Sequence, residues 1–306
     1  MKKKKNKVLI TGALGQDGVI LSKILLKKKF KVFGIIKKKR YKNKIKGIKY
    51  LVSNLSKIKE TRKLLFEIKP DYIVHLGSEN PSYLEKNKKK LIFNNRNKMN
   101  SLNLIDSIIS NKLKTIFIFG NSSQIFEKKY YQVNEKSKII IKDSYTKFRI
   151  DILKVLKDLK KKKNFKFINL ILFNHDSIYR NKKFLFPRVI KAIKNEDIKF
   201  INEIYKENIY GDFSHAEDIC NGIYLLIKKN IITDNIILSS KKLTSVNKII
   251  YQLLNKKLKS KLINKKNVNK KNINLIGDNS FAKKILGWKI KKNISIATKE
   301  ILRNLS

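Results

Sequence analysis

The chain has few of the residues that cross-link small proteins or bind soft metals. Its 306 residues include one cysteine, Cys220, which excludes an internal disulfide and any metal cluster built from several cysteines. The three histidines, His75, His175 and His215, lack the spacing of metal ligands, so no metal site is predicted. No run reaches about 18 consecutive apolar residues, and the lysine-rich start lacks the apolar core of a signal peptide. These absences predict a cytoplasmic protein with no membrane segment.

Acidic residues are also scarce, with 23 Asp and Glu against 73 Lys and Arg and a formal net charge of +50. Such an excess is common in proteins that bind nucleic acids. The lysines are spread along the whole chain, however, and no helix-turn-helix, zinc-finger or aromatic RNA-binding pattern accompanies them. We interpret the charge as a compositional bias. We expect no specific nucleic-acid partner, only salt-sensitive adhesion to polyanions.

Glycine is scarce as well, yet three of the 11 glycines lie three residues apart in TGALGQDG, residues 11–18. Glycine allows backbone conformations and close approaches that other residues do not. An apolar run at 7–10 precedes this segment, and an apolar helical pattern follows it from residue 19. A strand, a glycine-rich turn and a helix together present free N–H groups to a phosphate. The pattern predicts a dinucleotide site at Gly12, Gly15 and Gly18.

Strand-length and helix-length apolar segments alternate along the first half of the chain. Predicted strands lie at 7–10, 31–36, 49–52, 72–76, 115–119 and 167–172, and predicted helices at 19–28, 57–68, 88–111 and 145–162. This order predicts an α/β fold with a Rossmann-type, doubly wound parallel sheet.

The rhythm loosens after the last of these strands. We therefore place a dinucleotide-binding domain at 1–173 and a smaller substrate-binding lobe at 174–306. The lobe has predicted helices at 184–195, at 215–229 and at the C-terminus. The Lys- and Asn-rich stretch 255–272 is expected to be a solvated surface segment.

The second predicted strand ends in Lys37-Lys38-Lys39-Arg40. Folds that prefer NAD place an acidic residue near this point, where it binds the ribose hydroxyls. The absence of an acid, together with the basic cluster, favours NADP over NAD as the cofactor.

Several segments resemble the extended short-chain dehydrogenase/reductase family, also called the NAD-dependent epimerase/dehydratase family. Within it they are most similar to the GDP-mannose 4,6-dehydratase group. The similar segments are TGALGQDG, HLGSENPS (75–82), NSLNLIDSI (100–108), GNSSQIF (120–126), LFNHDSIYR (172–180), DFSHAEDI (212–219) and GDNSFAKKILGWK (277–289). The resemblance covers nearly the whole chain.

The resemblance implies an enzyme of nucleotide-sugar metabolism, a lyase that converts GDP-mannose to GDP-4-keto-6-deoxy-mannose with NADP. The cofactor-binding residues that it implies are Gly12, Gly15, Gln16, Asp17, Gly18, Lys37, Lys38, Asn54 and Leu76.

The catalytic residues follow from the same resemblance. Tyr145, in DSYTKFR, is similar to the family's general acid–base tyrosine. A free phenol titrates near ~10, so such a tyrosine needs a neighbouring cation. The family supplies a lysine four residues later, and here that position is Arg149. Ser122 and Ser123 would hydrogen-bond the 4-oxygen of the sugar. Gln124 stands where the dehydratases have the glutamate that removes the C5 proton.

Two of these positions depart from the family pattern. An arginine cannot release a proton, and an amide cannot act as a base near neutral pH. Lys147 is a poor substitute for the lysine because it points to the far side of the helix, and Glu79 is the nearest candidate to replace the glutamate. Two alternatives therefore stay open, a nucleotide-sugar 4-keto reductase or epimerase of the same family, and a catalytically impaired member that acts as a binding protein.

The substrate-binding residues that the resemblance implies are Asn174 and Arg180, at positions that hold the nucleotide diphosphate, and Arg188 on the following helix. Arginine forks suit phosphate oxygens. The dehydratase group has an arginine where Gly211 stands, and the segment before Gly277 lacks that group's Arg-Pro-x-Glu pattern. The identity of the sugar and of the nucleotide base in the substrate therefore stays open. A short loop after the second predicted strand suggests a homodimer.

Overall fold

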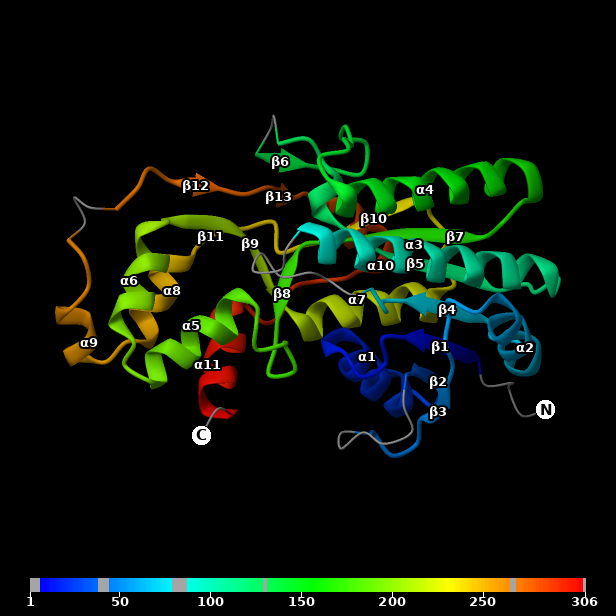
Figure 1. Ribbon diagram of the computed structural model, residues 1–306, viewed down its shortest axis with the longest axis horizontal. Helices are drawn as coiled ribbons and strands as arrows, with labels where there is room; N and C mark the ends of the chain where they lie inside the picture. The colour runs from blue at the N-terminus through cyan, green and yellow to red at the C-terminus, as the bar shows by residue number, and fades with distance from the viewer. Residues whose placement is uncertain (1–5, 38–43, 79–86, 129–130, 265–267, 305–306) are drawn as a thin grey trace. The chain divides into compact units, whose positions relative to one another are not determined.

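Figure 1 shows the computed structural model of the chain, in which residues 6–37, 44–78, 87–128, 131–264 and 268–304 are described. A seven-stranded sheet has the order β10-β7-β5-β4-β1-β2-β3. Its strands are β1 (Lys7–Thr11), β2 (Lys31–Ile36), β3 (Lys49–Val52), β4 (Tyr72–His75), β5 (Ile116–Ser122), β7 (Phe167–Leu172) and β10 (Asn235–Leu238). The pairs β1–β2, β1–β4, β2–β3 and β4–β5 are parallel. The predicted Rossmann-type α/β fold is confirmed.

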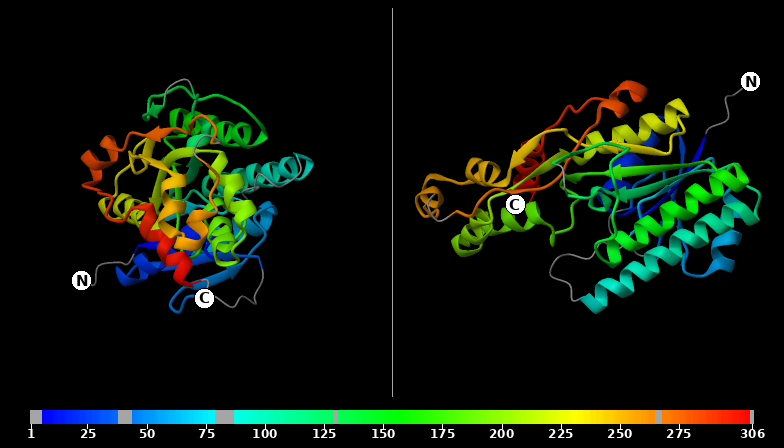
Figure 2. Two further views of the ribbon diagram at one scale, coloured as in Figure 1. Left: turned by 90° about the vertical axis from the view of Figure 1, so that its left-hand side faces the viewer. Right: turned by 90° about the horizontal axis from the view of Figure 1, so that it is seen from above.

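Helices cover both faces of this sheet. They are α1 (Gln16–Lys27), α2 (Ile58–Ile68), α3 (Asn87–Ser110), α4 (Ser144–Lys163) and α7 (Ala216–Lys229). Helix α3 packs against α2 and α4, and the right-hand view of Figure 2 shows α3 and α4 on one face of the sheet and α7 on the other. Apolar side chains such as Leu9, Ile73 and Phe117 are fully buried beneath α3 and α4. No helix of the described residues is long and apolar enough to cross a bilayer.

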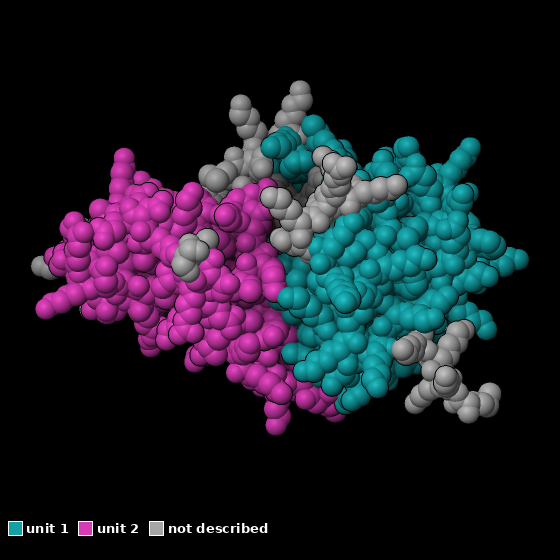
Figure 3. Space-filling view, turned by 90° about the horizontal axis from the view of Figure 1, so that it is seen from below, with its two compact units in different colours: residues 1–127, 138–171, 220–236 teal, residues 128–137, 172–219, 237–306 magenta. Residues whose placement is uncertain are grey.

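The seventh strand, β10, was not predicted. Its four residues come after α7 and the short connection 230–234, and the strand pairs with β7 at the edge of the sheet. The chain accordingly forms two compact units that interleave in sequence, shown in teal and magenta in Figure 3. The first comprises 1–127, 138–171 and 220–236, and the second comprises 128–137, 172–219 and 237–306. The units change near residue 172, but most of α7 and the start of β10 belong to the first unit, where β10 pairs with β7 at the edge of the sheet.

The second unit contains small mixed sheets. In the sheet β11-β9-β12, strand β8 also pairs with β9, and β13 pairs with β6 separately. These strands are β6 (Gln132–Val133), β8 (Asn174–Asp176), β9 (Ile209–His215), β11 (Leu243–Ser245), β12 (Asn272–Ile273) and β13 (Ile276–Gly277). The helices are α5 (Leu185–Lys194), α6 (Ile198–Lys206), α8 (Val246–Leu253), α9 (Lys256–Ser260), α10 (Ser280–Leu286) and α11 (Ile294–Asn304).

Part of the stretch 255–272 is less exposed than expected. Helix α9 lies within it, and Leu258 is buried in the core of the second unit together with Phe186 and Ile249. Lys256 and Lys257, which precede Leu258, are exposed, which is why the composition of the segment indicated only a surface.

The carboxylate of Asp212 on β9 joins three segments of the second unit. Its Oδ1 accepts hydrogen bonds from Ser240 N at 2.7 Å and Ser240 Oγ at 2.6 Å. Its Oδ2 accepts from Lys241 N at 3.0 Å and Gly277 N at 3.1 Å. Burial raises the pKa of the Asp212 carboxyl, and these four donors oppose that shift by favouring the charged form.

A second carboxylate of the same motif, on Asp218, fixes the segment after α10. Its Oδ2 accepts hydrogen bonds from the main-chain N–H groups of Lys291 and Lys292, at 2.9 and 2.7 Å. The buried Trp288 donates from Nε1 to the main-chain oxygen of Asp218 at 2.8 Å. The segments DFSHAEDI and GDNSFAKKILGWK therefore contact each other, and these residues serve the packing of the second unit.

Candidate active site

A cavity of about 640 Å³ lies at the carboxyl ends of the first strands of the seven-stranded sheet, within the first unit. Parallel sheets bind ligands at this edge, where the strand order reverses. Here β1 lies between β2 and β4. The cavity is lined by Thr11, Gly12, Ala13, Leu14, Gly15, Ile35, Ile36, Lys37, Val52, Ser53, Asn54, Leu55, Ser56, Glu60, Gly77, Arg96 and Asn100.

The glycine turn forms one side of this cavity, and its geometry excludes side chains. Gly12 has a φ of 72°, and a Cβ on it would lie 2.9 Å from Gly77 Cα. A Cβ on Gly18 would lie 2.2 Å from Gly12 O, because the first turn of α1 packs directly on the loop. Gly15 immediately precedes α1, and no side chain caps this helix end. The first main-chain N–H groups of α1 thus suit a phosphate, and the cavity fits the dinucleotide that the sequence predicts.

The other predicted cofactor residues fall into two groups. Lys37 and Asn54 line the cavity with Gly12 and Gly15. Gln16 and Asp17 begin α1 outside the lining, where Gln16 is buried and its Nε2 donates to Asp17 Oδ1 at 3.2 Å. Leu76 immediately precedes Gly77, which lines the cavity in its place. Lys38 lies outside the described residues.

The sequence analysis missed Glu60, Arg96 and Asn100, which line the cavity from α2 and α3. No motif marks these positions. One signal could have found Arg96, because only seven of the 73 basic residues are arginines and each is a candidate for a planar contact.

A chain of hydrogen bonds through Ser101, His75 and Thr11 fixes the main chain at Gly77. The Ser101 hydroxyl donates to Asn97 O at 2.9 Å, so Ser101 Oγ accepts from His75 Nε2 at 2.9 Å. His75 Nδ1 is then the acceptor for the Thr11 hydroxyl at 2.7 Å. The Thr11 oxygen in turn accepts from Gly77 N at 2.9 Å. These directions assign a neutral imidazole protonated on Nε2.

The surroundings of His75 favour the same neutral state. Its ring is fully buried and stacks on Phe119, with centroids 6.1 Å apart. Burial lowers the pKa of His75 to about 3, and the positive charge of Arg149 adds to this effect. The imidazole therefore acts as a fixed hydrogen-bonding element at neutral pH rather than as an acid or base.

The three predicted catalytic residues of GNSSQIF lie where β5 ends in a short 3₁₀ turn. The Ser122 hydroxyl accepts a hydrogen bond from Gln124 N at 3.2 Å. Ser123 is buried in the turn, and the Gln124 side chain is exposed. The N–H of Ser122 donates to Asn121 Oδ1 at 2.8 Å, which fixes the backbone at this point.

Asn121 belongs to a ladder of asparagines that crosses three strands, β5, β7 and β10. Asn121 Nδ2 donates to Asn169 Oδ1 at 2.9 Å, and Asn169 Nδ2 donates to Asn235 Oδ1 at 2.8 Å. Asn121 and Asn169 are both buried. The ladder ties the position of Ser122 to the interior of the sheet.

Lys142 brings the start of α4 to the 3₁₀ turn. Its Nζ donates to the main-chain oxygens of Gln124 at 2.9 Å and Phe126 at 2.5 Å. Asp143 then caps α4 by accepting from Thr146 N at 2.8 Å. Tyr145 is the second residue of α4, and α4 contacts the 3₁₀ turn that follows β5.

Arg149 lies one helical turn after Tyr145 and is buried. Its Nη1 donates to Gly120 O at 2.8 Å, and its guanidinium carbon lies 4.4 Å from the centroid of the Tyr145 ring. The arginine therefore stacks on the phenol ring and anchors it to β5. Lys147 is exposed, with its Nζ 3.6 Å from Asp151 Oδ2.

The predicted substrate residues belong to the second unit. Asn174 is exposed on β8, next to the loop that carries Arg180. Arg180 Nε lies 2.8 Å from Asp176 Oδ1, and its guanidinium stacks on Phe184 at 3.8 Å. The Asp176 carboxylate and the Phe184 ring together fix the orientation of the Arg180 guanidinium, and Asp176 offsets part of its positive charge.

Arg188 extends from α5 over the ring of Phe200, at 4.7 Å. Gly211 lies on β9, and a Cβ there would meet the Phe213 ring at 3.1 Å. A larger side chain at Gly211 would therefore require the Phe213 ring to shift. Glu79 lies outside the described residues. Among the described residues, no cluster of His, Cys, Asp and Glu could hold a metal ion.

Comparisons with known proteins agree with this architecture. A solved UDP-glucose 4-epimerase from Thermotoga maritima superimposes with a TM-score of 0.79 at 16% identity, covering 98% of each chain. A dTDP-glucose 4,6-dehydratase from Bacillus anthracis, solved in complex with NAD, gives a TM-score of 0.77 at 12% identity, covering 97% of this chain and 96% of the other. These similarities confirm the fold of the extended short-chain dehydrogenases/reductases.

Sequence similarity is more specific. The GDP-mannose 4,6-dehydratase of Yersinia enterocolitica is 24% identical over 264 residues, covering 78% of this chain and 68% of the relative. The GDP-mannose 4,6 dehydratase of Dictyostelium discoideum is 22% identical, covering 99% and 96%. The family model described as GDP-mannose 4,6 dehydratase matches residues 9–301. The chain therefore belongs to the GDP-mannose 4,6-dehydratase family, within the extended short-chain dehydrogenases/reductases.

Proposed function

We propose that the protein is an NADP-dependent enzyme that converts GDP-mannose to GDP-4-keto-6-deoxy-mannose. The observation that carries this proposal is the arrangement of the first unit. A cavity closed by a glycine turn lies at the strand ends, and Tyr145 and Arg149 stand beside the Ser122 turn of the same sheet. Family membership supports a nucleotide sugar as the substrate.

Each residue then has a defined task. When bound, the dinucleotide would supply the hydride acceptor and donor of the reaction. The Tyr145 oxygen takes the proton of the sugar 4-hydroxyl as C4 is oxidised, and it gives this proton to C5 when the hydride returns to C6, so that the 4-oxygen stays a ketone. Arg149 stabilises the phenolate through its fixed positive charge, and Ser122 and Ser123 hydrogen-bond the 4-oxygen. Arg180 and Arg188 supply cations for the diphosphate.

Dehydration also requires removal of the C5 proton, and here the chain departs from its relatives. The Gln124 amide has no basic oxygen at neutral pH. Losing a positioned base typically costs about 10²–10⁴ in rate. We infer that the dehydratase reaction is slow in this chain, and that water or a carboxylate elsewhere in the site takes the C5 proton.

The same observation favours a second candidate. A 4-keto reductase or a 4-epimerase needs hydride transfer and the Tyr145 proton at C4, and it needs no base at C5. Gln124 is compatible with that chemistry.

One incubation separates the two candidates. Purified protein with GDP-mannose and NADP is expected to give a product lighter by one water in mass spectrometry. Gln124→Glu is expected to raise its formation at least about tenfold, because a carboxylate restores the base. Tyr145→Phe serves as the control for adventitious conversion, since it removes the proposed acid–base group and leaves the ring packing.

If neither the wild type nor Gln124→Glu forms this product, the dehydratase proposal fails. Oxidation of NADPH by a 4-keto-6-deoxy sugar nucleotide would then establish the reductase. A thermal-shift series with GDP-, UDP-, dTDP- and CDP-sugars identifies which nucleotide the substrate carries, because a ligand that binds the native protein raises the melting temperature of the protein. Stabilisation by UDP-sugars alone would favour the epimerase.

A further inference from the structure

Besides the glycine turn, the cavity is lined by α3 and by the segment that follows β3. Ser56 Oγ donates to Asn100 Oδ1 at 2.9 Å, and Asn103 Nδ2 donates to Leu55 O at 2.8 Å. These bonds fix one face of α3 against the segment 53–56. Arg96 lies four residues before Asn100, hence on the same helix face, and both line the cavity.

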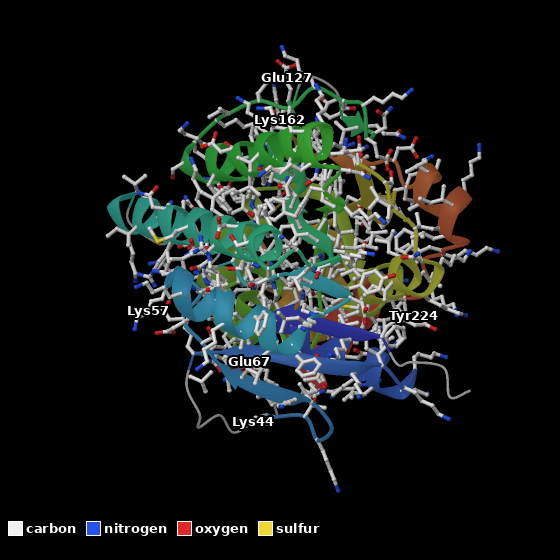
Figure 4. The ribbon with its side chains drawn as sticks, turned by 90° about the vertical axis from the view of Figure 1, so that its right-hand side faces the viewer. Lys44, Lys57, Glu67, Glu127, Lys162 and Tyr224 are labelled. Carbon is white, nitrogen blue, oxygen red and sulfur yellow. The ribbon has the colours of Figure 1, made fainter. Side chains whose placement is uncertain are left out.

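The charged groups that line the cavity have an excess of positive charge. Lys37 follows β2, Arg96 extends from α3, and Glu60 is the one carboxylate among the residues that line the cavity. Lys57, labelled in Figure 4, immediately precedes α2, and its Nζ lies 2.9 Å from Glu60 Oε1. Asn54 N also donates to Glu60 Oε2 at 3.4 Å. The bond to Lys57 lowers the pKa of Glu60, so Glu60 is ionised and Lys57 balances it.

The two cations line the cavity from different elements, Lys37 from the residue after β2 and Arg96 from helix α3. The glycine turn follows β1, Lys37 follows the neighbouring strand β2, and the segment 53–56 follows β3. Lys37 and Arg96 line the same cavity as the glycine turn, so a ligand whose diphosphate sits at that turn occupies the space that both cations line. A planar guanidinium and a flexible ammonium together suit a phosphate monoester.

We propose that Arg96 and Lys37 bind the phosphate on the adenosine ribose of NADP, and that Arg96 is the specificity-determining residue. This inference rests on the proposed function, because it requires a dinucleotide in the cavity. It adds a cation from α3 to the basic end of β2, and it makes the preference for NADP depend on a residue nearly sixty positions away in sequence from Lys37.

The test uses the full chain and fluorescence titration with NADPH and NADH, with 2′,5′-ADP and 5′-ADP as competitors that lack the nicotinamide. The variants are Arg96→Gln, Lys37→Gln and Arg96→Lys. The matched control is Arg62→Gln, because Arg62 pairs with Asp106 at 2.8 Å and does not line the cavity. Arg96→Gln is expected to weaken NADPH and 2′,5′-ADP about 10- to 100-fold and NADH less than about threefold.

Arg96→Lys is expected to restore most of the affinity for NADPH, because the charge remains, and Arg62→Gln is expected to change neither nucleotide. Unchanged melting temperatures show that the variants are folded. Equal losses for NADPH and NADH, or no loss, would overturn the inference while leaving the cofactor site intact. Tighter binding of NADH by the wild type, lost in Glu60→Gln, would overturn it in favour of a ribose-binding carboxylate. If the wild type binds neither nucleotide, the proposed function fails as well.

Discussion

The two units use the segments that resemble related enzymes in opposite ways. In the first unit the glycine turn lines a cavity, and the 3₁₀ turn after β5, which contacts α4, carries the exposed Gln124 side chain. In the second unit Asp212 and Asp218 of DFSHAEDI bond to main-chain N–H groups and lie in the interior. The sequence similarity to the family thus has two physical origins. In the first unit the similar segments surround the candidate site, and in the second unit they serve packing.

This contrast gives different expectations for substitution. A polar side chain with a proposed chemical role, such as Tyr145, can be changed with little effect on stability and a large effect on activity. A residue such as Asp212, which satisfies four donors, should show the reverse. The following predictions test that separation.

The largest effect is expected for Tyr145→Phe, which removes the phenol oxygen and keeps the ring that packs edge-on against Phe148. Turnover should fall by about 10²–10⁴ because the acid–base group is lost, and the melting temperature should stay the same. Steady-state kinetics and thermal unfolding measure the two quantities. Tyr131→Phe is the control, since Tyr131 is exposed. A loss of turnover below threefold would remove Tyr145 from the proposed mechanism.

Asp212→Asn is expected to lower the free energy of unfolding by about 2–4 kcal/mol, because an amide cannot accept from donors at both of its atoms and the site is buried. Urea denaturation measures the change. Asp106→Asn is the matched control, because its partner Arg62 is exposed and such pairs contribute less than about 1 kcal/mol. Equal effects of the two substitutions would contradict the structural role of Asp212.

His75 predicts a dependence of stability on pH. The unfolded imidazole takes up a proton near ~6.5, whereas burial holds the pKa of folded His75 to about 3. Between these values the unfolded state binds more protons, so stability rises with pH and is lost as pH falls. This group alone should cost on the order of 2 kcal/mol between pH 7 and pH 5. Urea titrations at several pH values should show a smaller slope for His75→Asn, and identical slopes would contradict the assignment.

The smallest effect is expected for Lys147→Ala. Its side chain is exposed, and its ion pair with Asp151 is a surface pair. We expect a change below about 0.5 kcal/mol in stability and activity within about twofold of the wild type. A large loss of activity would mean that Lys147, rather than Arg149, supports the catalytic tyrosine.

Much of the fold could be predicted because long apolar segments determine it. The strands at 31–36, 49–52 and 167–172 have the predicted limits, since each is a short apolar run, and those at 31–36 and 167–172 are largely buried. The strands of the second unit are two to seven residues long and carry no such run. Their positions depend on tertiary bonds such as those of Asp212, which no local pattern contains.

The candidate site shows the same limit. The spacing of four residues predicted that Tyr145 and Arg149 share a helix face, because that relation is local. Arg96 and Glu60 enter the cavity from α3 and α2, and no sequence motif marks either position. The sequence also could not give the direction of the Arg149 guanidinium, which stacks on the Tyr145 ring and bonds to Gly120 O.

The asparagine ladder across β5, β7 and β10 has a consequence for how these strands find their partners. Ile, Leu and Phe fill much of both strands around Asn121 and Asn169, so apolar contacts alone would tolerate a slipped pairing. A slip of one residue would turn the amides to opposite faces and leave each buried amide unpaired, at a cost of about 1–3 kcal/mol for each group. Three side chains thus select a single alignment of the strands during folding, and the segment that carries Ser122 acquires its position from that selection.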